Sequence, residues 1–126
     1  MTMNFFKRRR FLKKANLLEL TPLRLHSHEI KENGQIVLLV EKFKNKELAK
    51  FMLGRRSGHF RIRLDEMGSA LWILMDGNSN VATLVSNLRT QWMEKPEKTE
   101  DLEQRVATFM SQLYDNRYIT FKELNE

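Results

Sequence analysis

The sequence of 126 residues contains no cysteine, only two prolines and only five glycines. Without cysteine the chain can form neither a disulfide framework nor a thiolate metal site, and it has no thiol nucleophile. Its longest apolar run, Ala70 to Met75, is far too short to cross a bilayer. No apolar stretch follows the basic N-terminus, so we do not expect a secretory signal. We expect a protein of the reducing cytoplasm.

Basic residues are concentrated at the N-terminus. Six of the 22 Lys and Arg residues lie within residues 1–14, which contain no acidic residue, and the remainder of the chain is neutral. We therefore predict a basic flexible arm over residues 1–16 and a single domain over residues 17–126.

A β-hairpin is predicted at the start of this domain. Asn33 and Gly34 form a strong turn dipeptide, because both residues tolerate a positive φ. Apolar segments flank the turn, and we expect strands over residues 22–30 and 35–42. The second strand is apolar on both faces, so both faces should be covered.

A short helix and a third strand are predicted next. The helix covers residues 46–53, where an apolar face ends at Gly54. In the stretch His59–Leu64, apolar side chains alternate with Arg61 and Arg63. A period of two is typical of a half-buried strand.

Three amphipathic helices follow. Asp65 and Gly77 fit the start and end of the first helix, and Asn80 and Thr99 fit the starts of the second and third. Trp72 lies beside the first apolar stripe, and we expect it in the core. The stripes are Met67, Leu71, Leu74 and Met75, then Val81, Leu84, Val85, Leu88 and Trp92, and finally Leu102, Val106, Phe109, Met110 and Leu113.

The predicted architecture combines these elements with a short final strand at residues 117–121. It is an α+β, winged-helix-like domain, in which a three-stranded antiparallel sheet is followed by three helices. The first helices form a helix-turn-helix that directly follows a strand.

Catalytic and metal-binding patterns are absent from the sequence. His26 and His28 lie two residues apart on a predicted strand, and His59 begins another, so three imidazoles could bind zinc. No carboxylate motif accompanies them, and solvated histidines on a sheet are common. The sequence has no P-loop, dinucleotide-binding glycine pattern or HExxH motif. We therefore expect no enzyme activity, no metal and no cofactor.

Nucleic acid is a partner to consider, because a helix-turn-helix with a basic arm is a common DNA-binding arrangement. The third helix would be the recognition element, yet Glu100, Asp101 and Glu103 open it and would repel phosphates. Nucleic-acid binding through the arm and wing is therefore the alternative function. A membrane- or complex-associated structural role, anchored by residues 1–14, is a third hypothesis.

The third strand suggests a peptide partner instead. Arg61 and Arg63 lie on one face, and Phe60, Ile62 and Leu64 lie on the other. An extended peptide can add to an exposed sheet edge through backbone hydrogen bonds, and the arginines would favour an acidic peptide. The charges can equally protect an edge strand from aggregation. An exposed edge also permits a homodimer by strand pairing or swapping.

The same region resembles the PqqD family of small proteins, named for pyrroloquinoline quinone biosynthesis. Its members carry a Leu-Asp-Glu, Gly, apolar-Trp and Asp-Gly series, then a helix, then a helix that ends in a short strand. The resemblance covers about residues 35–121, with Asn116 where a glycine is common. The matching residues are Leu64, Asp65, Glu66, Gly68, Trp72, Asp76 and Gly77.

The resemblance implies a non-catalytic adaptor that holds the leader of a ribosomally made precursor peptide. Such adaptors present the leader to a modifying enzyme, often a radical S-adenosylmethionine (radical SAM) protein. In the family the leader is similar to an added strand in the cleft between the third strand and the third helix. Part of the helical set must be core. By position, the implied peptide-binding residues are Phe60, Arg61, Ile62, Arg63, Leu64, Leu102, Arg105, Val106 and Phe109.

Overall fold

The computed structural model describes residues 14–41 and 59–124, and the chain divides into two compact units. The sheet unit consists of residues 26–69, and the helical unit consists of the other described residues. The predicted helix over residues 46–53 and residues 1–13 of the predicted arm lie outside the described residues.

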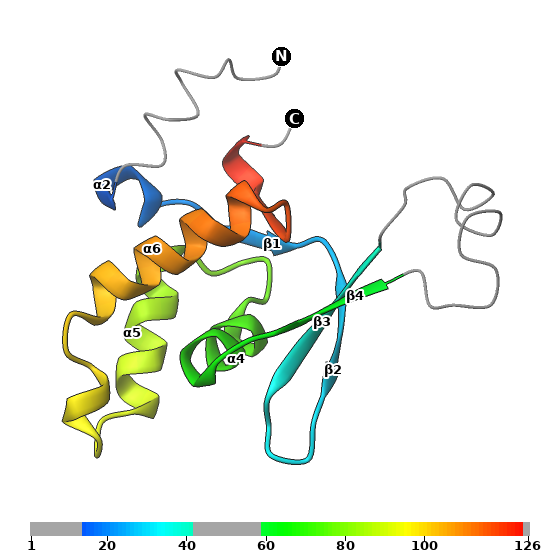
Figure 1. Cartoon of the computed structure of the whole chain (residues 1–126). Helices are drawn as coiled ribbons and strands as arrows, with labels where there is room; N and C mark the ends of the chain where they lie inside the picture. The colour runs from blue at the N-terminus through cyan, green and yellow to red at the C-terminus, as the bar shows by residue number, and fades with distance from the viewer. Residues whose placement is uncertain (1–13, 42–58, 125–126) are drawn as a thin grey trace, which may run out of the picture. The chain divides into compact units, whose positions relative to one another are not determined.

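Three antiparallel strands form the sheet unit (Figure 1). They are β2 (Ser27–Ile30), β3 (Ile36–Glu41) and β4 (His59–Arg63), with β3 in the centre. The predicted hairpin turn joins β2 to β3: Gly34 has a φ of 86°, and its N–H donates to the Lys31 carbonyl at 2.8 Å. Three helices follow this sheet, which confirms the predicted α+β class.

The first half of β3 is buried on both faces, as its continuous apolar sequence predicts, whereas Leu39 and Val40 are half-buried. Ile36, Val37 and Leu38 are fully buried, although successive side chains of a strand point to opposite faces. Each buried side chain of this size contributes about 2 kcal/mol to the hydrophobic free energy of folding. β3 is therefore the main apolar element of the sheet unit.

Helix α4 (Glu66–Leu74) begins as predicted but ends three residues before Gly77, the residue expected to close it. The Asp65 carboxylate accepts a hydrogen bond from the Gly68 N–H at 2.7 Å, which satisfies one of the unpaired amides at the helix start. Beyond the helix, Gly77 has a φ of 80°, in the left-handed region that favours glycine. The helix begins in the sheet unit and continues into the helical unit.

Ser69 connects β3 to the start of α4. Its buried hydroxyl accepts from the Ile36 N–H at 2.9 Å and donates to the Leu64 carbonyl at 3.2 Å. Ser69→Ala is expected to lower the free energy of unfolding by about 1–3 kcal/mol, because a buried N–H then lacks a partner. Urea denaturation measures this loss, and Ser86→Ala, at an exposed position on a helix, is the control. Equal stability of the two variants would contradict the prediction.

The helical unit contains helices, two short paired strands and two 3₁₀ turns. In Figure 1, α5 and α6 lie side by side, and β1 pairs antiparallel with β5. Among the described residues, no helix has both the length and the apolar character needed to span a membrane. The further elements are α2 (Lys14–Leu17), β1 (Pro22–Arg24), α5 (Val81–Gln91), η1 (Pro96–Lys98), α6 (Leu102–Asp115), β5 (Ile119–Phe121) and η2 (Lys122–Leu124).

The predicted apolar stripes of α5 and α6 form the core of the helical unit. All five predicted positions on α5 and its C-cap are buried, and Asn80 caps the helix by accepting from the Thr83 N–H at 2.8 Å. On α6 four of the five predicted positions are buried, whereas Phe109 is half-buried. Trp72 is fully buried, as expected, and the Arg24 guanidinium carbon lies 5.9 Å from the centroid of its ring.

The prediction of one strand over residues 22–30 is wrong, because this stretch forms two strands of different sheets. β1 pairs with β5 and β2 pairs with β3. The Leu25 N–H donates to the Tyr118 carbonyl at 3.1 Å, and the chain then bends at His26. β5 is three residues long, and its register covers only residues 22–24 of this stretch. His26 and His28 consequently do not share a strand.

The predicted start of the third helix at Thr99 is also wrong. Pro96 opens the 3₁₀ turn η1, and the Thr99 hydroxyl donates to the Pro96 carbonyl at 2.8 Å. This hydroxyl therefore does not cap a helix. α6 begins three residues later, after Asp101, which has a left-handed φ of 51°.

Thr21 and Glu123 link the segments next to β1 and β5. The Glu123 carboxylate accepts from the Thr21 N–H at 2.7 Å and from the Thr21 hydroxyl at 2.8 Å. Partial burial alone would raise the pKa of Glu123, but the two hydrogen bonds from Thr21, a hydrogen bond from the Glu123 backbone and the charge of Lys122 together lower it. The contact is thus present at neutral pH and weakens as the carboxylate is protonated in acid.

Candidate functional site

β4 is an edge strand of the sheet in the part of the chain that the structure describes. It pairs with β3, and no other described strand lies along its second side. Edge strands present backbone N–H and C=O groups that a further strand can bind. The position of β4 in the sheet agrees with the sequence-based hypothesis of an exposed edge.

The hydrogen-bond pattern shows which β4 residues face this edge. The Leu64 N–H donates to the Ile36 carbonyl at 2.9 Å, and the strands are in antiparallel register. In an antiparallel pair, alternate residues direct their backbone groups toward the partner strand. Ile62 therefore faces β3, whereas the backbone groups of Arg61 and Arg63 face outward. Among the described residues these outward groups have no hydrogen-bond partner.

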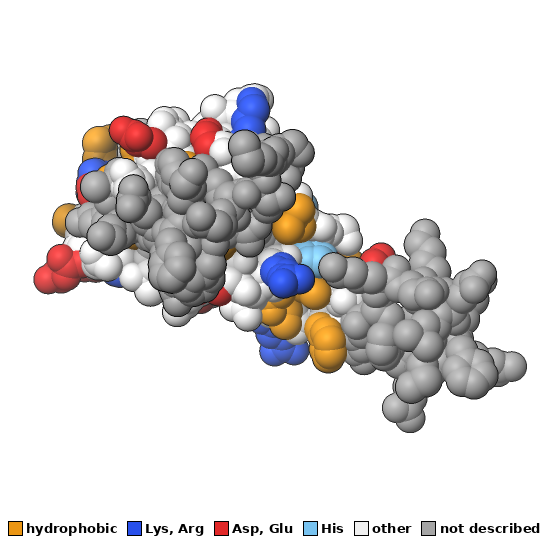
Figure 2. Space-filling model, turned by 90° about the horizontal axis from the view of Figure 1, so that it is seen from above, with side chains coloured by type: hydrophobic (Ala, Val, Ile, Leu, Met, Phe, Trp, Pro, Cys, Tyr) orange, Lys and Arg blue, Asp and Glu red, His pale blue; other side chains and the backbone are white. Residues whose placement is uncertain are grey.

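The apolar face of β4 is less buried than its alternation suggests. Leu64 is buried and Ile62 is half-buried, but the Phe60 side chain is 54% exposed. Exposed apolar and basic side chains lie next to one another on the surface seen in Figure 2. An exposed phenylalanine on an edge strand is a ready apolar contact for a ligand.

The two arginines of β4 differ in their electrostatic environment. Arg61 donates to the Glu29 carboxylate of β2 at 2.7 Å, across β3. This hydrogen bond lowers the pKa of Glu29 and raises that of Arg61, so both groups are charged over the whole neutral range. Arg63 is exposed and forms no ion pair within the described ranges. Arg63 is therefore the β4 cation that is available to an acidic ligand.

The predicted site residues on α6 divide into core and surface. Leu102 and Val106 are buried in the helical unit. Arg105 is exposed and donates to the carbonyls of Lys98 and Glu100, at 2.7 and 3.2 Å, which closes the loop before the helix. Phe109 is half-buried. Only Arg105 and Phe109 of this set thus present surface to a ligand.

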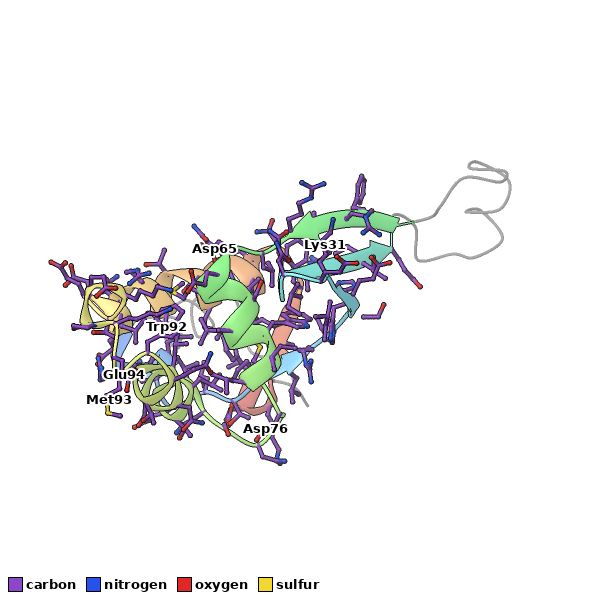
Figure 3. All side chains as sticks on the ribbon, turned by 90° about the horizontal axis from the view of Figure 1, so that it is seen from below. Lys31, Asp65, Asp76, Trp92, Met93 and Glu94 are labelled. Atoms are coloured by element: carbon purple, nitrogen blue, oxygen red, sulfur yellow. The ribbon has the colours of Figure 1, made fainter. Side chains whose placement is uncertain are left out.

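Two features of the described surface were missed in the sequence. One is the Arg61–Glu29 ion pair, which the strand register brings together and which the hairpin prediction could have suggested. The other is a hollow of about 490 Å³ at the end of α5, lined by Thr90, Gln91, Trp92, Met93, Glu94 and Lys95. Figure 3 labels three of these residues, of which Met93 is 73% exposed. No sequence motif indicated this hollow.

Within the described residues, no three histidine, aspartate or glutamate side chains gather into a possible metal site.

Comparison with known proteins identifies the family. The family described as "Coenzyme PQQ synthesis protein D (PqqD)" matches residues 50–119, a stretch that includes β4 and helices α4 to α6. No curated protein and no solved structure matches the chain. Because the family match covers more than half of the chain and includes the residues on which the resemblance was based, the protein belongs to the PqqD family.

Proposed function

We propose that the protein is a non-catalytic adaptor that binds a ribosomally made precursor peptide and presents it to a modifying enzyme of the radical SAM type. Membership of the PqqD family supports a role in peptide-based biosynthesis. In this proposal the leader of the precursor adds to the sheet as a fourth strand, along the open edge of β4.

The observation that carries the proposal is the outward direction of the Arg61 and Arg63 backbone groups on an edge strand. An added strand finds two donors and two acceptors there, at the spacing of a β-ladder. Phe60 and Ile62 offer apolar contacts to alternate side chains of the peptide, and Arg63 favours an acidic residue. Arg105 and Phe109 of α6 are the further peptide contacts that we propose.

The competing explanation is that the charges on β4 only prevent sheet edges from aggregating. Under that explanation no peptide binds with saturation, and acidic peptides show no preference. The two explanations therefore differ in a direct binding experiment.

The test is a backbone amide NMR titration of the labelled full chain with short peptides encoded beside its gene, and with a random DNA duplex as the control. We expect saturable shifts concentrated at residues 59–65, Arg105 and Phe109 with peptide alone. Binding should persist at high salt, because strand addition depends on backbone bonds and apolar contacts, whereas nucleic-acid binding weakens steeply. Shifts with DNA alone, or peptide shifts confined to other residues, would contradict the proposal.

A further inference from the structure

Within residues 14–41 and 59–124, β2 forms the second edge of the sheet. The Lys31 N–H donates to the Gln35 carbonyl at 2.9 Å, and β2 and β3 are in antiparallel register. The alternation of an antiparallel ladder then directs the backbone groups of Glu29 toward β3 and those of Ile30 away from it. The Ile30 side chain is 63% exposed. At this edge of β2, the backbone N–H and C=O of Ile30 therefore point outward, and the Ile30 side chain is exposed.

The residues on either side of Ile30 carry opposite charges. Glu29 and Lys31 are both exposed, and Figure 3 shows Lys31 on the sheet unit. If two copies of this segment pair antiparallel about Ile30, the two Ile30 side chains lie opposite each other. Each Glu29 then lies opposite the Lys31 of the other copy. Opposite charges and apolar pairs at directly facing positions both stabilise a sheet.

Neighbouring registers lack this complementarity. Pairing centred on Glu29 places two glutamates opposite each other, and pairing centred on Lys31 places two lysines opposite each other, which is destabilising. In the register centred on Ile30, the outward N–H and C=O of the two Ile30 residues also exchange both hydrogen bonds. Charge, apolar contact and backbone direction therefore select the same register.

We propose that β2 is a self-association edge, on which a second copy of this chain docks antiparallel about Ile30. The result is a continuous sheet in the order β4–β3–β2–β2–β3–β4, with both β4 edges at its ends and open to peptide. The ion pair between Arg61 and Glu29, 2.7 Å long, is retained, and Lys31 of the second copy adds to it. Because the contact is a short edge, the dimer is weak and concentration-dependent.

The test is sedimentation equilibrium of the full chain over a range of concentrations. We expect a reversible dimer whose association constant falls at least about tenfold in Lys31→Glu and in Glu29→Lys, because each change turns two attractive pairs into repulsive ones. The two variants mixed should associate as a heterodimer, since the mixture restores both pairs. Lys122→Glu, which changes the net charge as Lys31→Glu does but at an exposed position of the helical unit, is the control and should dimerise normally.

A wild-type chain that stays monomeric, or a mixture that gains no association over its components, would overturn the proposal. Ile30→Lys provides a second check. The Ile30 side chain is exposed and its backbone groups point away from β3, so the hairpin should still fold and only dimerisation should be lost. NMR spectra of each variant establish that it is folded. Peptide binding at β4 is a separate measurement, so failure of the proposed function would leave this result interpretable.

Discussion

Replacing Arg63 by proline is expected to lower the affinity for the precursor peptide at least about tenfold, with little change in stability. Proline lacks an N–H and is tolerated on an edge strand where that N–H faces outward. The outward N–H of Arg63 is one of two donors that we assign to the peptide, and its loss leaves a peptide carbonyl unpaired, which costs about 1–3 kcal/mol. Isothermal titration calorimetry with the peptide measures the effect, and urea denaturation measures stability.

Two matched variants separate the backbone from the side chain. Arg63→Ala removes the same charge but keeps the N–H, so it should weaken binding much less and mainly for acidic peptides. Ile62→Pro removes an N–H that faces β3, so it should destabilise the sheet instead. If Arg63→Ala weakens binding as much as Arg63→Pro, the backbone is not what holds the peptide, and the strand-addition mechanism is wrong.

Trp72→Ala is expected to give the largest loss of stability, about 3–5 kcal/mol. The indole is fully buried, and truncation to alanine loses its transfer free energy and leaves a cavity. Since small proteins are stable by only about 5–15 kcal/mol, much of the variant should be unfolded at modest urea concentrations. Urea denaturation followed by far-UV circular dichroism measures the change in midpoint.

Arg24→Ala is the control for Trp72→Ala, because the Arg24 guanidinium lies over the Trp72 ring. The Arg24 guanidinium lies 5.9 Å from the Trp72 ring centroid, and a cation–π contact at an exposed site contributes about 0.5–1 kcal/mol. Arg24→Ala should therefore cost far less than Trp72→Ala. A loss below about 1 kcal/mol for Trp72→Ala would show that the helical unit does not depend on this side chain.

Local sequence patterns predicted most of the fold because they report the period and the ends of each element. Asn33, Asp65 and Asn80 located the hairpin and two helix starts, because each of these side chains accepts a hydrogen bond from a backbone N–H two or three residues later. Gly34 located the same hairpin through its positive φ. The apolar stripes located the core of α5 and α6 for the same reason. Trp72 was assigned to the core although it lies beside the stripe, and its complete burial confirms this.

The parts that were missed depend on contacts between residues far apart in the sequence. The division of residues 22–30 into β1 and β2 is set by β5, about a hundred residues later, and no proline or glycine marks the bend. The ion pair of Arg61 depends on the register of three strands. Similarly, Leu102 and Val106 lie on the apolar stripe of α6, yet the family resemblance also implied them as peptide contacts, and only the packing of α6 assigns them to the core.

The pairing of β1 with β5 also constrains when the protein can fold. Pro22 lies opposite Phe121, so this two-stranded sheet closes a loop of about a hundred residues, and such closure is entropically costly and slow. During synthesis residues 26–69 of the sheet unit are made before β5, so β1 has no strand partner until residues 119–121 leave the ribosome. The β1–β5 sheet can therefore form only after residues 119–121 have been made, and a chain truncated before residue 119 would leave β1 without this partner and exposed to aggregation.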